Sequence, residues 1–157
     1  VLMLMLLAPM TMMAQKFGKV NTQTIMQALP DVAKANGELE ALQKQKDNEL
    51  KAMQDELNRK LDEYQKGQST MNATAKQQKE TELQGLNQKI QQAYQDGQQE
   101  LQKKSNELMQ PIVAKVRAAI DAVGKAGNYT YIFEEGAAIY TGSNVVDVTK
   151  EVQSKIK

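Results

Sequence analysis

The sequence contains neither cysteine nor histidine. Without cysteine the chain can form no disulfide, carries no thiol nucleophile and cannot be lipidated through an N-terminal cysteine. The absence of histidine removes the usual general base and a common metal ligand. Carboxylates, hydroxyls and lysines remain, but no nucleophile with an adjacent base can be assembled from this set. We therefore expect no enzyme, no cofactor and no metal site.

Aromatic residues are also scarce: they make up 4% of the chain, tryptophan is absent, and the mean hydropathy is −0.58. Glutamine is abundant instead, with 20 residues, 16 of them between Gln43 and Gln110. This composition is typical of long solvated helices and is poorly suited to a packed globule. We expect the apolar surface to be buried along helical stripes or between subunits.

An excess of charge of either sign is lacking as well. The chain has 20 basic and 19 acidic residues, well interspersed, for a net charge of +1. No strong field is available to recruit nucleic acid or anionic lipid. Acidic pairs such as Asp55-Glu56 lie near Arg59 and Lys60, at a spacing typical of surface ion pairs on a helix.

The first fourteen residues carry no charge and consist mainly of Leu and Met. This run is too short to span a bilayer as a helix and resembles the apolar region of a secretory signal peptide with a truncated start, cleaved after Ala14. A short N-terminal anchor is the alternative. We expect an exported protein that is not stably inserted in a membrane.

Apolar residues recur every eleven positions over residues 31–66, where Leu39, Leu50 and Leu61 form one row, and again over residues 75–124. At 3.67 residues per turn such a stripe hardly drifts around a helix. Two helices with the same period can keep their stripes in contact as a straight antiparallel hairpin. The residues expected to form its core are Leu39, Leu42, Leu50, Met53, Leu57, Leu61, Tyr64, Leu83, Leu86, Ile90, Tyr94, Leu101 and Leu108.

The tip of this hairpin is predicted at residues 67–75 (GQSTMNATA), with Thr74 and Gln77 spaced as a capping box for the returning helix. Pro111 lies further along that helix, where it removes a backbone donor, so that the helix kinks or a new helix starts. It is a candidate hinge. Met53 and Met71 lie on or near the stripe, where flexible thioethers suit contact with varied apolar partners, although such methionines more often belong to a core.

Strand-like segments lie at both ends of the chain: residues 16–21 (KFGKVN), 129–133 (YTYIF) and 137–141, with a last helix capped by Asp147 or Thr149. The fold class predicted is mainly α with a small β body. Residues 15–30 and 125–157 form the body, and a helical-hairpin arm, residues 31–124, is inserted between them. Because a sheet this small is marginal alone, we expect it to oligomerise. The residues expected in this oligomerisation body are Val20, Ile132, Phe133, Ile139, Tyr140, Val145 and Val148.

The N-terminal strand ending in Val20-Asn21, the Gln/Lys/Glu-rich hairpin and the tail YIFEEGAAIYTGSNVVDVT together resemble the Skp/OmpH family of periplasmic chaperones. In that family a pair of strands, a Tyr corresponding to Tyr140 and a unit matching Asp147-Val148-Thr149 occur in this order. The resemblance implies a homotrimer whose strands form a small body, with three arms enclosing a cavity for unfolded outer-membrane proteins, without ATP. The best-known members are strongly basic, however, whereas residues 38–124 here hold 13 basic and 14 acidic residues. Charge-driven capture and lipopolysaccharide binding are therefore in doubt.

Two functions stay open at this point. The first is a periplasmic holdase that sequesters unfolded outer-membrane proteins by many weak contacts. The second is a non-catalytic coiled-coil adaptor or spacer of a cell-envelope assembly, whose tip at residues 67–75 would be its binding site. A prefoldin-like chaperone is disfavoured, because that family has its helices at the chain ends and its strands in the middle.

Overall fold

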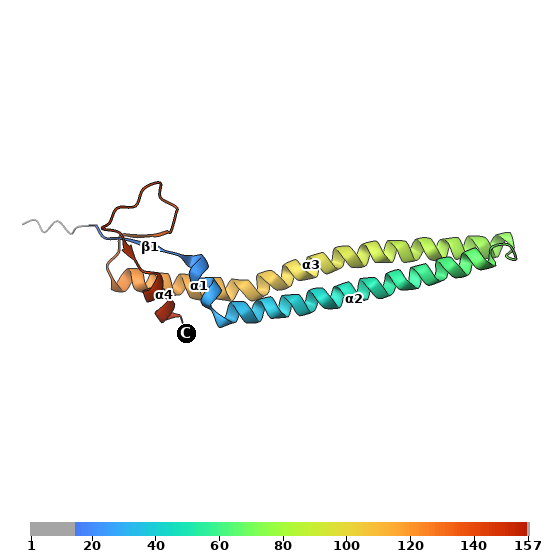
Figure 1. Ribbon diagram of the computed structural model, residues 1–157, viewed down its shortest axis with the longest axis horizontal. Helices are drawn as coiled ribbons and strands as arrows, with labels where there is room; N and C mark the ends of the chain where they lie inside the picture. The colour runs from blue at the N-terminus through green and yellow to red at the C-terminus, as the bar shows by residue number, and fades with distance from the viewer. Residues whose placement is uncertain (1–14, 157) are drawn as a thin grey trace, which may run out of the picture. The chain divides into compact units, whose positions relative to one another are not determined.

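The computed structural model describes residues 15–156, so the expected signal peptide at residues 1–14 lies outside the described residues. Helices dominate this range, and short strands occur towards both ends of the chain (Figure 1). This confirms the predicted class, a mainly helical chain with a small β part. In chain order the elements are β1 (Phe17–Val20), α1 (Thr22–Ala28), α2 (Pro30–Gly67), α3 (Ala73–Ala126), β2 (Tyr131–Glu134), β3 (Val146–Asp147) and α4 (Thr149–Lys155).

The chain divides into two compact units, which we call the body (residues 15–28 and 114–156) and the hairpin (residues 29–113). Helix α3 contributes to both. The sequence had placed residues 114–124 in the arm, but they belong to the body, because the apolar stripe continues there as Val116, Ala119 and Val123, all buried. The eleven-residue repeat runs on across this boundary and therefore could not locate it.

The hairpin consists of α2 and the first part of α3, which run antiparallel and side by side (Figure 1). Helix α2 begins at Pro30, whose missing N–H and fixed φ suit the first turn of a helix. At the tip the carbonyl of Gly67 accepts hydrogen bonds from the backbone N–H and the hydroxyl of Thr70, at 3.0 and 2.9 Å. The tip therefore lies within the predicted range of residues 67–75.

The start of α3 differs from the prediction. The helix begins at Ala73, so Thr74 is already inside it and the expected Thr74–Gln77 capping box is wrong. Asn72 takes the capping role instead: its Oδ1 accepts the backbone N–H of Ala75 at 2.8 Å. Asparagine is among the best N-cap residues, which accounts for the earlier start.

Three strands within residues 15–156 form one parallel sheet in the order β2-β1-β3. Phe17 is paired with Tyr131 and Val20 with Glu134, while Gly18 of the same strand is paired with Val146. The N-terminal strand is therefore central, and both of its neighbours come from the C-terminal part of the chain.

The strand expected at residues 137–141 is absent, and this segment is an irregular loop. The segment has the composition of a strand but packs no apolar face against the body, since Ile139 and Tyr140 are exposed. The second C-terminal strand is β3 instead, anchored by the fully buried Val148, whose N–H donates to the carbonyl of Lys19 at 2.9 Å. This partner is distant in sequence, so local composition could not reveal the pairing.

The core of the body is small and aliphatic. Its fully buried side chains are Ile25, Val123, Val148 and Val152. Helices α1 and α4 contact each other, and the backbone N–H of Asn21 donates to the hydroxyl of Thr149 at 3.0 Å. The start of α4 is held by Asp147 Oδ1, which accepts the N–H of Thr149 at 3.0 Å, although Val148 occupies the formal cap position.

Candidate functional site

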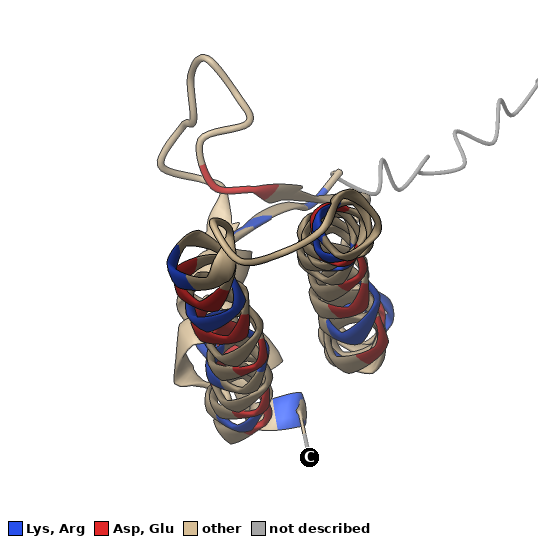
Figure 2. Ribbon diagram, turned by 90° about the vertical axis from the view of Figure 1, so that its right-hand side faces the viewer, with Lys and Arg blue, Asp and Glu red and all other residues tan. Residues whose placement is uncertain are grey.

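Exposed apolar side chains gather on the sheet and the adjoining loop of the body. Phe17, Tyr131 and Phe133 form a row of stacked rings, with centroid distances of 6.2 and 5.6 Å. The last two rings are 59% and 45% exposed, and Ile139 and Tyr140 on the loop are almost completely exposed. Residues 136–145 contain no charged residue, and their loop is uniformly tan in Figure 2. An apolar, uncharged surface of this kind is typical of an interaction site.

The residues predicted for the oligomerisation body fall into three groups. Val20 and Val148 are buried within the single chain, so they stabilise the fold and cannot contact a partner directly. Ile132 and Val145 are half-buried, and the exposed members are Phe133, Ile139 and Tyr140. Sequence reasoning missed Ile25 and Val152, whose signal was the amphipathic character of the two short helices that contain them.

Two adjacent carboxylates join the end of β2 to the start of α1. Glu134 Oε1 accepts the backbone N–H of Thr22 at 2.9 Å. Glu135 accepts hydrogen bonds from the Lys19 ammonium at 2.8 Å and from the Asn21 amide at 2.9 Å. Both carboxylates therefore serve as structural acceptors.

This arrangement makes the stability of the body depend on pH. The hydrogen bonds from Lys19 and Asn21 hold the pKa of Glu135 below its usual value of 4.5. A carboxylate with a lowered folded-state pKa contributes stability above the unfolded-state pKa and loses it as the pH falls through the folded-state value. We expect Glu135→Gln to be less stable than the wild type at pH 7 and to approach it below about pH 4.

Urea denaturation at several pH values measures this difference. Asp121→Asn is a suitable control, since Asp121 is an exposed carboxylate that pairs with Lys125 on its own helix. An unchanged pH dependence in Glu135→Gln would contradict the assignment.

Both helices of the hairpin carry interspersed positive and negative residues along their length (Figure 2). Several pairs cross between the helices: Lys46 with Glu100 at 2.7 Å, Lys104 with Glu38 at 3.4 Å, Lys60 with Glu82, and the Tyr64 hydroxyl with Glu80 at 2.6 Å. The hydrogen bond to Glu82 raises the pKa of Lys60, and the one to Glu100 raises that of Lys46. Exposed pairs of this kind add little stability but fix which residues lie opposite each other.

The apolar stripe between the helices is only partly covered. Leu57 and Leu83 are buried, at 3% and 8% exposure. The other predicted core residues are half-buried except Tyr94, which is 57% exposed and differs from the prediction. A tyrosine can lay its ring along an apolar surface and keep its hydroxyl in water, which the eleven-residue spacing does not reveal.

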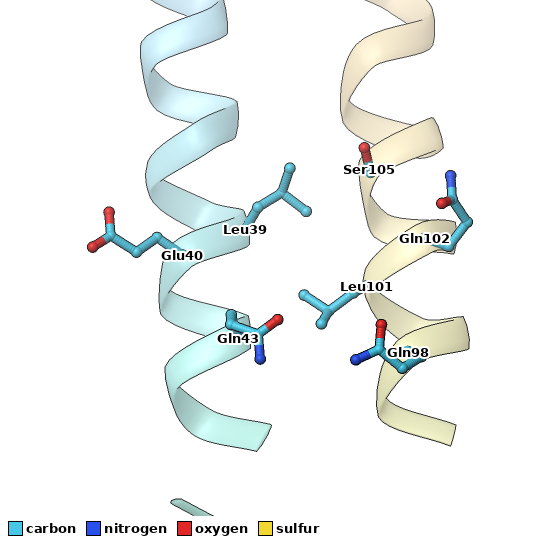
Figure 3. Close-up of a pocket in the computed structure, with 7 residues that line it drawn as sticks. All are labelled: Leu39, Glu40, Gln43, Gln98, Leu101, Gln102 and Ser105. Atoms are coloured by element: carbon cyan, nitrogen blue, oxygen red, sulfur yellow. The ribbon is translucent and has the colours of Figure 1, made fainter. Parts of the chain in front are cut away.

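Two shallow hollows open on the surface of the hairpin. The first is lined by Leu39, Glu40, Gln43, Gln98, Leu101, Gln102 and Ser105. Figure 3 shows Leu39 and Leu101 pointing towards each other across the space between the helices, with Glu40 pointing away from α3. The second hollow is lined by Leu50, Lys51, Gln54, Ile90, Gln91, Tyr94 and Gln95. Neither was predicted as a hollow.

The remaining predicted residues lie as follows. Met53 is half-buried in α2, and Met71 at the tip packs its methyl group against Gly67. Pro111 lies inside α3, which continues through it, so no new helix starts there. Within residues 15–156 no cluster of acidic side chains could hold a metal ion, and no helix is long and apolar enough to cross a membrane.

The sequence profile of the family described as outer membrane protein (OmpH-like) matches residues 16–156, nearly the whole described chain. The chain belongs to the OmpH-like family. Two curated relatives of this OmpH-like chain are named chaperone protein Skp. The one from Pectobacterium atrosepticum is 26% identical over 92% of this chain and 87% of its own length, and the one from Yersinia enterocolitica is 26% identical over 98% and 93%.

A solved structure shares the OmpH-like fold: a putative outer membrane chaperone from Caulobacter crescentus superposes with a TM-score of 0.79 over 90% of this chain and 83% of that one. Its sequence is 15% identical, so this likeness concerns the fold. Family membership supports a chaperone role and a periplasmic location.

Proposed function

We propose that this OmpH-like protein is a periplasmic holdase that works without ATP or catalysis and sequesters unfolded outer-membrane proteins between the hairpins of a homotrimer. The observation that carries the proposal is the half-covered stripe of the hairpin, where most apolar residues remain partly accessible. A surface that offers many weak apolar contacts suits an unfolded chain, which presents apolar groups in no fixed arrangement. The names of the relatives point to the same class of function.

The experiment is suppression of aggregation. An outer-membrane β-barrel protein denatured in urea is diluted into buffer with and without the protein, and light scattering is followed. We expect scattering to be suppressed at about one trimer per client, and no suppression at several-fold excess would contradict the proposal. Exchanging the tip sequence, residues 67–75, should leave suppression largely intact, whereas an adaptor that binds through its tip would lose its partner.

Assembly through the body is the second part of the proposal. Strands β2 and β3 lie at the two edges of the sheet, and the exposed Phe133, Ile139 and Tyr140 adjoin it. Open edges beside an apolar surface are suited to contact with other copies of the chain. Met53 and Met71 are proposed as client contacts, since both are partly accessible.

We expect Ile139→Asp to shift the protein towards the monomer, because it places a charge in an uncharged contact surface while leaving the fold of the single chain intact. Ile139 is 109% exposed, so the fold of the single chain does not depend on burying its side chain. Light scattering coupled to size exclusion measures the mass. Gln27→Asp is the control, because it adds the same charge at an exposed position on α1, outside the loop. Equal masses for Ile139→Asp and the wild type would exclude the loop from the contact.

Pro111 is proposed as a flexible point of α3. It cannot donate to the carbonyl of Glu107, so one hydrogen bond of the helix is missing at this turn. We expect Pro111→Ala to slow hydrogen exchange of the neighbouring amides in residues 108–115 and to leave exchange near the tip unchanged. Exchange that is unaltered around position 111 would show that the turn is already rigid.

A further inference from the structure

The two hollows of the hairpin are equivalent in the eleven-residue repeat. We call the apolar lining residues Leu39 and Leu101 the floor of the first hollow, and Leu50 and Ile90 the floor of the second. Leu39 and Leu50 lie eleven residues apart on α2, and Ile90 and Leu101 lie eleven residues apart on α3. The rims repeat in the same way, with Gln43 matched by Gln54 and Gln102 by Gln91. The hairpin therefore carries two copies of one surface unit, about 16.5 Å apart at 1.5 Å per residue.

These units lie on one side of the contact between the helices, and ion pairs lie on the other. Glu38 and Lys60 pair with residues of α3, and each precedes a leucine of the Leu39 row by one residue. One residue corresponds to a rotation of about 100° around a helix, so these charged side chains emerge on the opposite edge of the stripe. Ion pairs between the helices therefore lie on one face of the hairpin, and the two hollows with their apolar residues lie on the other.

The rims of the hollows are chemically unusual because they are built mainly from glutamine and carry little charge. Each hollow has three glutamines and a single charged residue, Glu40 or Lys51. Glu40 points away from α3 (Figure 3), and Lys51 pairs with Asp55 at 2.9 Å. A glutamine amide offers both donors and an acceptor, the combination that complements the N–H and C=O groups of a peptide backbone.

An extended, uncharged polypeptide segment fits these properties. A strand destined for a membrane β-barrel alternates apolar and polar residues over about ten residues, and its backbone groups have no partner before folding. Ten extended residues span about 33 Å, enough to reach both hollows. A charged ligand would find little compensating charge at the rims and would lose hydration on binding.

We propose that the two hollows bind extended β-strand segments of the unfolded client, with apolar client side chains on the Leu39/Leu101 and Leu50/Ile90 floors and client backbone groups hydrogen-bonded to the glutamine rims. This inference rests on the holdase function proposed above and specifies which face of the hairpin is used and which segments of the client it selects. Recognition depends on backbone groups and alternation, so it does not depend on a particular client sequence.

The test uses the full chain and a dye-labelled ten-residue peptide in which Val alternates with Thr, with binding followed by fluorescence anisotropy. The variant Gln91→Glu/Gln102→Glu places one carboxylate on each rim. The matched control, Gln88→Glu/Gln99→Glu, changes the same residue type on the same helix with the same spacing of eleven and the same net charge, at exposed positions outside both hollows. Circular dichroism confirms that both fold.

We expect the rim variant to bind the peptide about tenfold more weakly, a loss of about 1.4 kcal/mol, and the control to bind as the wild type does. The lysine version, Gln91→Lys/Gln102→Lys, should lose affinity as well, because the rims require neutrality. Equal binding by the rim variant and the control would overturn the inference, and so would tighter binding by the lysine version. If the wild type suppresses client aggregation but does not bind the peptide, the hollows are not the site and the holdase function stands. A wild type that suppresses no aggregation refutes the holdase function itself.

Discussion

Replacing Ile25 with alanine is expected to lower the free energy of unfolding of the body by about 3 kcal/mol. Ile25 is fully buried, on the helix α1 that contacts α4. The substitution removes buried methyl and methylene groups and leaves a cavity that the surrounding aliphatic side chains fill only partly. Since the body has few fully buried side chains, the loss of one is a large part of what stabilises it.

Urea denaturation followed by near-ultraviolet circular dichroism measures the effect, because Tyr129 and Tyr131 lie in the body and report on its packing. All variants are compared at one protein concentration, because the self-association proposed above would stabilise the folded chain by mass action. Gln27→Ala, an exposed position on the same helix, is the control. A loss in Ile25→Ala no greater than that in Gln27→Ala would show that α1 is not held by its buried face.

The second large effect is an increase in stability. Changing the three glycines inside the hairpin helices, Gly37, Gly85 and Gly97, to alanine is expected to raise the stability of the hairpin by about 3 kcal/mol, about 1 kcal/mol for each helix-interior glycine. A Cβ would meet nothing within 4 Å at the first two positions. At Gly97 it would reach the Lys46 side chain at 3.7 Å, an ordinary contact distance. The gain in helix propensity is therefore not offset by a clash.

Glycine-to-alanine changes in the body are expected to have the opposite effect on stability. Gly136 has a φ of 84°, which an alanine adopts only with strain, and a Cβ at Gly127 would clash with the ring of Tyr129. Gly127→Ala and Gly136→Ala should therefore destabilise the protein. Thermal unfolding followed at 222 nm compares all variants. A hairpin triple variant that melts below the wild type would mean that these glycines provide a close approach that the distances do not show.

The hairpin could be predicted because the pattern that specifies it lies within short stretches of the sequence. The eleven-residue repeat of Leu39, Leu50 and Leu61 fixes which face of α2 is buried, and the same period in α3 fixes its partner. The turn was recognisable from its Gly, Ser and Asn residues. Its cap was placed wrongly, because Thr74 and Asn72 are both good caps and only the three-dimensional turn selects between them.

The body was harder because its pairing is non-local. Residues 137–141 have the composition of a strand but remain a loop, whereas the two residues of β3 pair with β1. The composition of a segment does not state where a partner strand will lie. The hollows escaped prediction for a related reason: periodicity identified Leu39 and Leu101 as core residues, and only the structure shows how far the stripe remains open between them.

The central position of β1 has a consequence for the order in which the chain folds during its synthesis. A chain that emerges from its N-terminus presents β1 first, but its partners β2 and β3 follow only after the whole hairpin has appeared. Contacts between segments so far apart in sequence form slowly. The hairpin can instead form from its tip outwards, because the residues that meet next to the tip are close in sequence. A hairpin that forms early brings β1 within reach of β2 and β3, so we expect the hairpin to form before the sheet.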